Sequence, residues 1–409
     1  MKKNLLYYSD CFFFAGCENM VANFLNSDAL KEEFNVHFVY RYSKQYEDGV
    51  RARINDMSIC QGVNLIIEPT MDEWVTSSNR LIACLQRIIW SICFIFIKYW
   101  SLYKNIQSLK KVFKKYNPDI VHINNGGYPA ATSAQSAVLA AHKCDVDKIY
   151  YVVNNMAMSY MHATRIFDVF VDPFIKRYVT KFITGSNNAG NHLKKVLSLP
   201  SEKQITIRNG IVQRSTTMTV LDFKSRYNIP GDKLVFTTIA NLEERKGHRY
   251  LLQAVKELRD EGELKNQIFI LEGKGPNESF INNFIRDNKL NEIVLLITVP
   301  AIYDLYAASD VVILPSIANE DFPNIIIESM GMGLPVIGTR IAGIPEQILP
   351  EKTGILIDPA NTEQIKSAII KMSLDSQFRL DCGNRAKEVF IDNYTSEKSV
   401  KNYIDLYHN

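Results

Sequence analysis

Two glutamates flank a proline in the segment N-E-D-F-P-N-I-I-I-E-S-M-G-M-G at 319–333. Glu320 precedes Pro323, and Glu328 lies in the apolar run that follows it. An ionised carboxylate in apolar surroundings needs a hydrogen-bond donor or a cation, because otherwise its pKa rises. The paired hydroxyls of a ribose would satisfy both oxygens of Glu328. A structural arginine, or a side chain that reaches solvent, would also account for this residue.

The same segment is expected to form a helix that begins at Pro323, since proline is favoured in a first turn, and that ends at 331–333. The first N–H groups of a helix have no partner within it. Those near Phe322, Asn324 and Ile325 can therefore hold an anion such as a phosphate.

A second group of polar residues lies in I-A-N-L-E-E-R-K-G-H at 239–248, where a strand gives way to a helix. Asn241, Arg245 and Lys246 can place donors and positive charge on a diphosphate. The alternative is an ordinary solvated start of a helix. Gly273, in E-G-K-G-P after another strand, either lets the backbone approach a ligand closely or forms a simple turn.

The first half of the chain offers fewer candidates. Gly16, in F-A-G-C-E after the first strand, would let the backbone approach a cleft from the other side. His122 and Asn124, in D-I-V-H-I-N-N, are expected at the carboxyl end of a strand. A lone histidine is most often structural, so only its position makes His122 a candidate for chemistry.

Short apolar runs alternate with helical stretches along the whole chain, which predicts two doubly wound α/β domains with parallel sheets. The expected strands are 4–8, 36–40, 63–67, 119–123, 148–153, 181–184, 234–240, 267–272, 294–296, 311–315, 335–338 and 354–357.

The seam between the two domains is expected within 199–233, where the residues are typical of a connection. We therefore predict a first domain at 1–200, a second at 201–395, and a final helix at 396–409 that can cross back to the first. Doubly wound sheets bind ligands beyond the carboxyl ends of their strands, so two facing sheets predict a site in the cleft between them.

The overall composition excludes several classes of protein. The chain has 409 residues, of which 46% are hydrophobic and 22% charged, and its net charge of +3 gives no reason to expect nucleic acid as a partner. The seven cysteines show no zinc spacing, which favours a reducing compartment, and the first residues do not read as a signal peptide. These features favour a cytoplasmic protein.

Several known catalytic motifs are also absent from the sequence. It has no G-x-G-x-x-G after the first strand, no Walker A pattern, no H-E-x-x-H and no G-x-S-x-G. Asp145 and Asp147 have the spacing of metal ligands, but a solvated turn explains them better. The missing patterns argue against a nicotinamide dehydrogenase and an α/β-hydrolase.

The segment 81–103 is rich in apolar and aromatic residues and carries basic residues at Arg87 and Lys98. One interpretation is a helix packed in a domain core. The other is a helix in a membrane interface, with Trp90, Tyr99, Trp100 and Tyr103 at the depth of the lipid headgroups. A helix that spans the membrane is less favoured, because the uninterrupted apolar run is short.

Taken together, these motifs resemble the family 4 retaining glycosyltransferases of the GT-B fold. The segment at 320–346 is similar to the most diagnostic stretch of that family, and the order A-G-C-E, V-H-I-N, G-S-N-N, R-N-G-I, A-N-L-E-E-R-K-G-H and E-G-K-G-P is similar throughout. The resemblance is strong in 234–357 and weak in 41–117.

This resemblance implies that the domain at 1–200 faces the acceptor and that the domain at 201–395 binds the nucleotide-sugar donor. It also implies a role for each motif, with Glu320, Lys246 and His122 as the catalytic residues. Glu328 would bind the ribose of a nucleotide-sugar donor, Glu320 would face the donor sugar, and Lys246 would meet the diphosphate. Further donor-binding positions would be Gly16, Asn241, Arg245, Gly273, Phe322, Asn324 and Ile325. The family usually has arginine where Asn241 stands, so Arg245 or Arg340 would replace it. His122 would take the place of a histidine that the family has near Asn154.

The resemblance implies a hexosyltransferase-type enzyme that retains anomeric configuration, uses a nucleotide sugar as its donor substrate, and needs no metal and no other cofactor. It would act in cell-surface polysaccharide biosynthesis on a glycan or lipid-linked glycan acceptor, in the cytoplasm or at the inner face of the membrane. Two alternatives stay open: a nucleotide-sugar isomerase or epimerase of similar fold, and a non-catalytic glycan-binding scaffold.

Overall fold

The computed structural model describes residues 2–11, 14, 16–161 and 165–409. The chain forms two compact units. Unit 1 comprises Met1–Ile207 and Val400–Asn409, and unit 2 comprises Arg208–Ser399. The division after Ile207 falls within the predicted seam, and the last residues of the chain group with unit 1.

Unit 1 contains a parallel sheet of seven strands in the order β3-β2-β1-β4-β5-β6-β7. The strands are β1 (Lys3–Ser9), β2 (Phe34–Arg41), β3 (Cys60–Val63), β4 (Ile120–Asn125), β5 (Lys148–Val153), β6 (Lys181–Thr184) and β7 (Gln204–Thr206). The chain runs outward from β1 to β2 and β3, and then returns to place β4 on the other side of β1. The switch point of this sheet therefore lies between β1 and β4.

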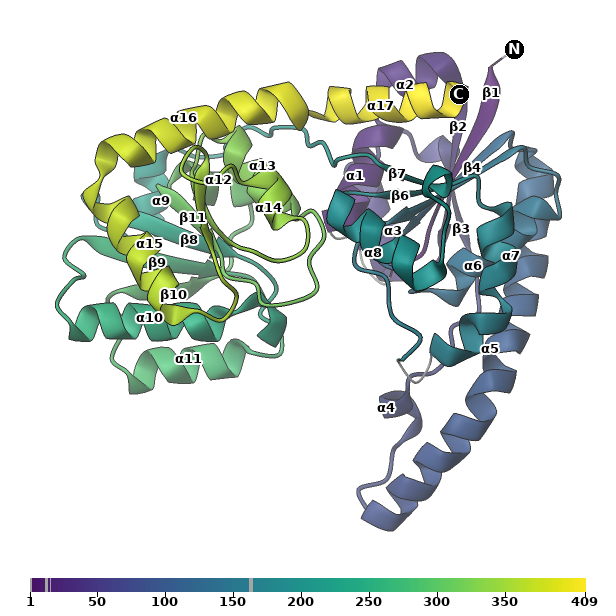
Figure 1. Cartoon of the computed structure of the whole chain (residues 1–409), viewed down its shortest axis with the longest axis horizontal. Coiled ribbons are helices and arrows are strands. Elements are labelled where there is room, and N and C mark those ends of the chain that lie inside the picture. Colours follow the sequence, from purple (N-terminus) through teal and green to yellow (C-terminus); the bar gives the residue numbers. More distant parts are fainter. Residues whose placement is uncertain (1, 12–13, 15, 162–164) are drawn as a thin grey trace. The chain divides into compact units, whose positions relative to one another are not determined.

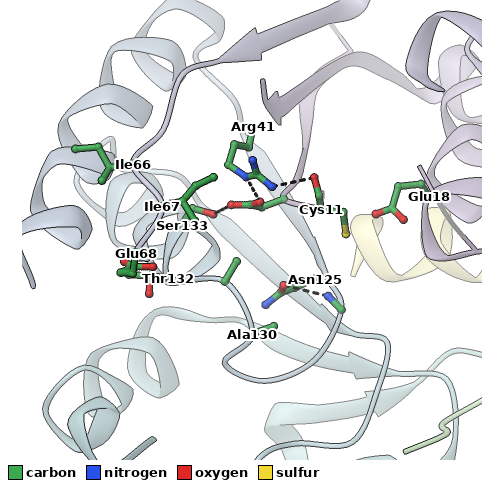
Figure 2. Close-up of a pocket in the computed structure, with 13 residues that line it drawn as sticks. Cys11, Glu18, Arg41, Ile66, Ile67, Glu68, Asn125, Ala130, Thr132 and Ser133 are labelled. Carbon is green, nitrogen blue, oxygen red and sulfur yellow. Dashed lines mark hydrogen bonds and ion pairs between the residues drawn. The ribbon is translucent and has the colours of Figure 1, made fainter. Parts of the chain in front are cut away.

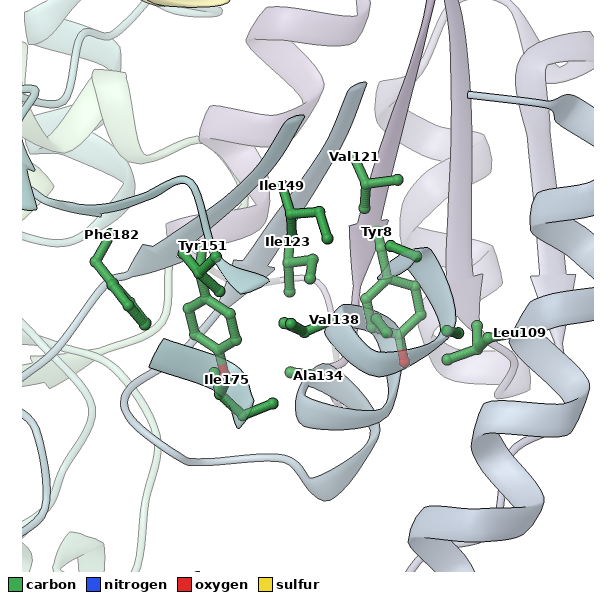
Figure 3. Packing of buried hydrophobic residues seen from close by; sticks show 14 of the residues in the cluster. Tyr8, Leu109, Val121, Ile123, Ala134, Val138, Ile149, Tyr151, Ile175 and Phe182 are labelled. Atoms are coloured by element: carbon green, nitrogen blue, oxygen red, sulfur yellow. The ribbon is translucent and has the colours of Figure 1, made fainter. Parts of the chain in front are cut away.

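Helices separate the strands of unit 1 and bury their apolar side chains. They are α1 (Gly16–Leu25), α2 (Asp28–Glu33), α3 (Lys44–Arg53), α4 (Met71–Trp74), α5 (Arg80–Tyr116), α6 (Thr132–His142), the 3₁₀ helix η2 (Arg165–Phe170), α7 (Asp172–Tyr178), α8 (Asn187–Leu197) and α17 (Ser396–His408). Figure 3 shows Tyr8 and Ile123 from the sheet packed beside Val138 of α6 and Leu109 of α5. Burial on both faces explains why these strands are apolar without alternation.

Helix α17 completes the core of unit 1 from the far end of the chain. The Tyr407 hydroxyl lies 2.9 Å from that of Tyr7 and 2.6 Å from Nδ1 of His122. The Tyr150 hydroxyl donates to the backbone oxygen of Leu406 at 2.9 Å. Residues separated by more than 250 positions thus share one buried layer of rings.

Unit 2 contains a parallel sheet of six strands in the order β10-β9-β8-β11-β12-β13. The strands are β8 (Leu234–Ile239), β9 (Gln267–Glu272), β10 (Val294–Ile297), β11 (Val311–Leu314), β12 (Val336–Thr339) and β13 (Gly354–Ile357). The helices are α9 (Val220–Arg226), α10 (His248–Asp260), α11 (Glu278–Asp287), α12 (Ile302–Ala307), α13 (Asn324–Gly331), α14 (Ile344–Gln347), α15 (Thr362–Leu374) and α16 (Ser376–Asn393). The switch point of this sheet lies between β8 and β11.

Two strand predictions differ from the structure. The apolar run 63–67 was expected to be a strand, but β3 ends at Val63, and 64–70 follows it without regular structure. Asn105 of α5 holds this segment, because its side chain accepts from the Ile66 N–H at 2.8 Å and donates to the Ile66 oxygen at 2.9 Å. Strand β7 was not predicted, since its sequence Q-I-T has little apolar signal.

Helix α5 has 37 residues and extends the predicted segment 81–103 at both ends. Its first half and α4 project away from the sheet of unit 1 (Figure 1). It is long and apolar enough to cross a membrane, by length and composition alone. Trp90 is 7% exposed and donates through Nε1 to the Pro69 oxygen at 3.1 Å. Trp90 and Tyr99, whose hydroxyl donates to the Phe167 oxygen, therefore face the protein rather than a lipid headgroup layer.

Candidate functional site

Two loops of unit 2 meet at the switch point of its sheet. One follows β8 and the other follows β11. Gly247, at φ +73°, lies so close to the second loop that a Cβ at this position would be 1.9 Å from the Pro315 oxygen. The Ile317 N–H donates to the Arg245 oxygen at 2.7 Å. The conformation and small size of glycine thus bring the two sequence motifs together.

The side chains of these loops converge on Glu320. Its Oε1 accepts hydrogen bonds from Lys246 Nζ and, at 2.8 Å, from Ser316 Oγ, and Arg245 Nη1 lies 3.7 Å away. Glu320 is 7% exposed. The sequence predicted Glu320, Lys246 and Arg245 as separate contributors, and the structure gathers them into one ion-pair cluster. Ser316 was not anticipated.

The guanidinium of Arg245 bonds to two different residues. Its Nε pairs with Glu243 at 2.6 Å, and its Nη1 donates to the Asn319 oxygen at 3.0 Å. Asn241 is exposed on the same loop, with its Nδ2 3.4 Å from Glu243 Oε1. Arg340 pairs instead with Asp358, at 3.5 Å. Arg245 is therefore the arginine that shares a loop and a neighbour with Asn241.

Gly273 has a structural contact that the sequence did not reveal. At φ +146°, a Cβ on this residue would lie 2.0 Å from the Ala240 oxygen. The close approach predicted for its backbone is therefore to the neighbouring β8 loop. Gly273 fixes that loop, and a direct contact with a ligand stays a prediction.

Helix α13 begins beside this cluster. Pro323 is its N-cap residue rather than a first-turn residue, and among the described residues no side chain caps the helix. Asn209 Nδ2 donates to the Asn324 Oδ1 at 2.9 Å and lies 3.3 Å from the Phe322 oxygen, while Gln347 Nε2 donates to the Pro323 oxygen at 3.1 Å. Phe322 is buried, and Ile325 lies in the first turn. The side chains of Asn209 and Gln347 thus fix the turn at 322–324 and, with it, the orientation of the first turn of α13.

Glu328 lies one turn further along α13 and is partly buried. The Tyr306 hydroxyl of α12 donates to its Oε2 at 2.8 Å. Burial raises the pKa of Glu328, while the hydrogen bond from Tyr306 and the charge of Arg214 act in the opposite direction. The structure thus supplies tyrosine as the protein partner of this carboxylate, which the sequence analysis did not consider.

His122 was predicted as a catalytic candidate at the end of a strand, and this prediction is wrong. It lies within β4, is 2% exposed, and stacks on the Tyr7 ring at 4.3 Å. Its Nδ1 meets the Tyr407 hydroxyl. Burial lowers its pKa to about 3, so the ring is neutral. A side chain enclosed in this way cannot touch a substrate.

Of the remaining first-domain predictions, Gly16 is the first residue of α1. Ala15, from the same motif, lies outside the described residues. Asn124 is buried in β4, and its Oδ1 accepts from Asn154 Nδ2 at 2.8 Å. A role for Gly16 beside a donor stays a prediction.

Comparisons with known proteins show which proteins this chain resembles. Residues 221–389 match the model of the family described as Glycosyl transferases group 1. The chain is 29% identical over 213 residues to N-acetyl-alpha-D-glucosaminyl L-malate synthase of Bacillus anthracis, covering 51% of this chain and 54% of that protein. It is 26% identical to the O-antigen biosynthesis glycosyltransferase WclY of Escherichia coli, covering 75% and 83%.

The fold of the whole chain matches that of solved structures. Anabaena Alr3699/HepE in complex with UDP and glucose superimposes with a TM-score of 0.76 at 15% identity, covering 100% of both chains. WaaG, a glycosyltransferase involved in lipopolysaccharide biosynthesis, superimposes with a TM-score of 0.65, covering 98% of this chain and 99% of that one. The protein therefore has the two-domain GT-B fold. The match to the group 1 glycosyl transferase model lies within unit 2 and covers less than half of the chain.

Proposed function

We propose that this protein transfers a sugar from a nucleotide-diphosphate sugar to a glycan or lipid-linked glycan acceptor, with retention of configuration, in the biosynthesis of a cell-surface polysaccharide. The observation that carries the proposal is the meeting of Lys246, Glu320 and the start of α13 at the switch point of unit 2. This arrangement combines a cation, a carboxylate and helix N–H groups within one small region.

Each group has a part in binding the donor. Lys246 and Arg245 neutralise the charge of the diphosphate. The backbone N–H groups of Asn324 and Ile325 donate hydrogen bonds to oxygens of the diphosphate or of the sugar. The ribose hydroxyls donate to Glu328, which is partly exposed and already fixed by Tyr306. Glu320 accepts from hydroxyls of the transferred sugar. Gly16 would contact the donor or acceptor from unit 1.

The chemical step needs no nucleophile from the protein. The acceptor oxygen forms a bond to the anomeric carbon on the face from which the diphosphate leaves, and its proton passes to a phosphate oxygen of that leaving group. Negative charge grows on the diphosphate as its bond to carbon breaks. Lys246 and the start of α13 stabilise that charge. Because these groups supply positive charge without a metal, we propose that transfer is metal-independent.

The proposal can be tested with the purified chain and a panel of nucleotide sugars. UDP-glucose comes first, because the Anabaena structure holds UDP and glucose. Thermal stabilisation identifies the donor, and product analysis with a lipid-linked acceptor identifies the transfer and its stereochemistry. Inversion of the anomeric centre would contradict the retaining mechanism. Conversion of the nucleotide sugar without any acceptor would instead indicate an isomerase or epimerase.

We further propose that the enzyme works at the inner face of the membrane, to which it attaches through α5. Several apolar or aromatic side chains of this helix are more than half exposed. They are Leu81, Ile82, Leu85, Ile88, Ile92, Phe96, Trp100 and Tyr103. Helix α5 contains eight lysines and arginines and no acidic residue. Apolar area together with positive charge favours a membrane that contains anionic lipids.

A second apolar segment of unit 1 adjoins α5. Phe170 is 67% exposed, and the other exposed apolar side chains of η2 and α7 are Ile166, Val169 and Phe174. Phe167 of η2 contacts α5 on its inner side, with its ring 6.3 Å from that of Phe94. A buried ion pair of 2.7 Å between Lys98 and Asp168 ties the two elements together. Membrane contact through both elements follows from this attachment.

Liposome sedimentation tests the attachment. The variant Leu85→Ser/Ile92→Ser/Phe96→Ser removes exposed apolar area only, and we expect it to lose binding to vesicles that contain phosphatidylglycerol. A matched control changes the exposed Leu374 and Leu380 of unit 2 to serine. Sedimentation of the α5 variant at the wild-type level would contradict the proposal.

A further inference from the structure

The segment 212–219 leads to α9, contains no helix or strand, and is largely exposed. Its first residues are nevertheless bonded to two helices of unit 2. The Tyr303 hydroxyl of α12 donates to the Val212 oxygen at 3.2 Å. The side-chain amide of Gln213 donates to the Gly331 oxygen, at the last residue of α13. The beginning of the segment is thus held against α12 and α13.

The end of the same segment is held by Asp304 of α12, which is 2% exposed. The Asp304 carboxylate accepts from the Thr217 N–H at 2.6 Å and from the Thr217 hydroxyl at 2.5 Å. Because ordering an exposed chain costs conformational entropy, these bonds are needed to keep it in one place. Only residues 214–216 lie between bonded positions, so Arg214 is carried at a defined place beside α12.

Arg214 lies within electrostatic reach of Glu328. Burial raises the pKa of Glu328, and the hydrogen bond from Tyr306 and the charge of Arg214 oppose this rise. Burial and the charge of Glu328 likewise raise the pKa of Tyr303, and Arg214 again acts in the opposite direction. The Tyr303 and Tyr306 rings are in edge contact, with their centroids 5.7 Å apart. The anchored segment therefore places a cation near the carboxylate that α13 presents.

The charge of Arg214 is free to bind a ligand. Its guanidinium forms no ion pair or hydrogen bond with any residue that the structure describes. Other arginines near strand ends are already bonded. Figure 2 shows Arg41, at a cavity of about 470 Å³ in unit 1, bonded to Asp10 and to the Cys11 oxygen. Arg245 of unit 2 is bonded in the same way to a neighbouring carboxylate.

A ribose held by Glu328 needs a hydrogen-bond donor as well as an acceptor. Each ribose hydroxyl donates one proton to a carboxylate, and its oxygen can then still accept. Glu328 has no N–H or O–H when ionised, and the Tyr306 hydroxyl already donates to its Oε2. A guanidinium only donates, and its planar fork can reach two neighbouring hydroxyl oxygens at once. Arg214 can therefore supply the donors that Glu328 lacks.

We propose that Arg214 and Glu328 bind the ribose of the nucleotide donor as a pair, in which Glu328 accepts the protons of the two hydroxyls and Arg214 donates to their oxygens. The inference rests on the proposed transferase function, which places the ribose at Glu328. It adds a donor-binding residue from the segment 212–219, whose sequence is typical of a connection. A 2′-deoxynucleotide lacks one of the two hydroxyls and uses this pair less fully.

Calorimetry on the full chain tests the pair. The probes are UDP, GDP and ADP, followed by the 2′-deoxy form of the one that binds best. Arg214→Met removes the N–H donors and keeps a long side chain, while Arg214→Lys keeps the charge without the planar fork. Arg286→Met is the matched control, because it makes the same change of net charge at an exposed ion pair with Asp287.

Wild type should bind the ribonucleotide more tightly than its 2′-deoxy form. We expect Arg214→Met to weaken ribonucleotide binding about three- to tenfold and 2′-deoxynucleotide binding by less, so that the preference shrinks. Arg214→Lys should fall between wild type and Arg214→Met, and Arg286→Met should match wild type. An equal loss for the two nucleotides would overturn the ribose assignment, because Arg214 would then act on the phosphates or the base.

Failure of the pair and failure of the donor site give different results. If wild type binds none of the three nucleoside diphosphates, the proposed donor site is wrong and the pair falls with it. If wild type binds one of them and Arg214→Met binds it equally well, only the pair is refuted. Thermal unfolding confirms that the variants are folded, and Arg214→Met should keep the wild-type Tm because this exposed side chain bonds to no described residue.

Discussion

The ion pair between Lys246 and Glu320 raises the question of whether Glu320 competes with the diphosphate for Lys246 or helps Lys246 to bind it. In the protein without donor, the lysine charge is already used by Glu320, whose Oε1 also accepts from Ser316 at 2.8 Å. A diphosphate that arrives must share or replace this partner. The substitution Glu320→Gln removes the competing charge and keeps the shape of the side chain. We therefore expect it to strengthen nucleoside diphosphate binding while sugar transfer is lost.

The magnitudes follow from the burial of the pair. The Lys246 and Glu320 side chains are 13% and 8% exposed, so their interaction is shielded from water. A hydrogen bond to a charged group contributes about 1.5–3 kcal/mol, so Lys246→Met should weaken diphosphate binding roughly 10- to 100-fold. The increase in diphosphate affinity caused by Glu320→Gln should be smaller, about tenfold at most. Only Lys246 gains a free charge in this variant, because Arg245 stays paired with Glu243.

Calorimetry with the best-binding nucleoside diphosphate measures both variants, and the double variant completes the cycle. Lys246→Met should also destabilise unit 2 by about 1–3 kcal/mol, since Glu320 keeps only Ser316 and the more distant Arg245. Lys256→Met is the matched control, because Lys256 forms an exposed pair with Asp260 at 2.8 Å. This control should change stability by less than about 1 kcal/mol.

If Glu320→Gln weakened nucleoside diphosphate binding as strongly as Lys246→Met, competition between Glu320 and the diphosphate would be excluded. Glu320 would then position the lysine for the diphosphate. Equal stability losses for Lys246→Met and Lys256→Met would show that burial does not strengthen the Glu320 pair.

Three other predictions concern protonation and metal. Burial raises the pKa of Glu328 above 4.5. Because its ionised form accepts hydrogen bonds from the ribose, donor affinity should fall as the pH drops through that raised pKa. A Glu328→Gln variant that kept the same pH dependence of donor affinity would contradict this prediction. His122 has a pKa of about 3 against 6.5 when unfolded, so its neutral burial should cost about 2 kcal/mol of folding free energy at pH 5 and almost nothing at pH 7.5. This loss should be absent in His122→Gln, and denaturant unfolding followed by tryptophan fluorescence measures it, since all three tryptophans lie in unit 1. Chelator should leave transfer unchanged, and activity that EDTA removes and Mg²⁺ restores would exclude the metal-independent mechanism.

The sequence predicted the strands well wherever burial on both faces produces an uninterrupted apolar run. The strands 148–153 and 267–272 have the predicted bounds in the structure. The run 63–67 is also apolar, but only Val63 belongs to a strand. Ile66 and Ile67 line a cavity instead, and Asn105 of α5 bonds to the Ile66 backbone. Local pattern does not distinguish these two uses of apolar residues.

The candidate site was predictable in its residue types and less so in its contacts. Glu328 stands out because a carboxylate is unusual within an apolar run. Lys246 and Glu320 lie in polar segments that could equally be solvated loops. Their pairing depends on the fit of Gly247 against Pro315, which no local pattern reveals. Tyr306, the partner of Glu328, comes from another helix, and nothing in its own segment distinguishes it from a core tyrosine.

His122 illustrates the same difficulty from the opposite side. Its expected position at the end of a strand suggested catalysis, and its burial against Tyr7 and Tyr407 shows otherwise. Tyr407 lies 285 residues away along the chain. A histidine can be assigned to a core or to a site only when its distant neighbours are known.

The location of Tyr407 also has a consequence for how the chain folds. Residues 400–409 are synthesised after all of unit 2, yet they supply hydrogen bonds inside unit 1. While unit 2 is being synthesised, the first 207 residues therefore lack the part of their core that residues 400–409 supply. The chain passes between the units twice, after Ile207 and after Ser399, so unit 2 is joined to unit 1 at both of its ends.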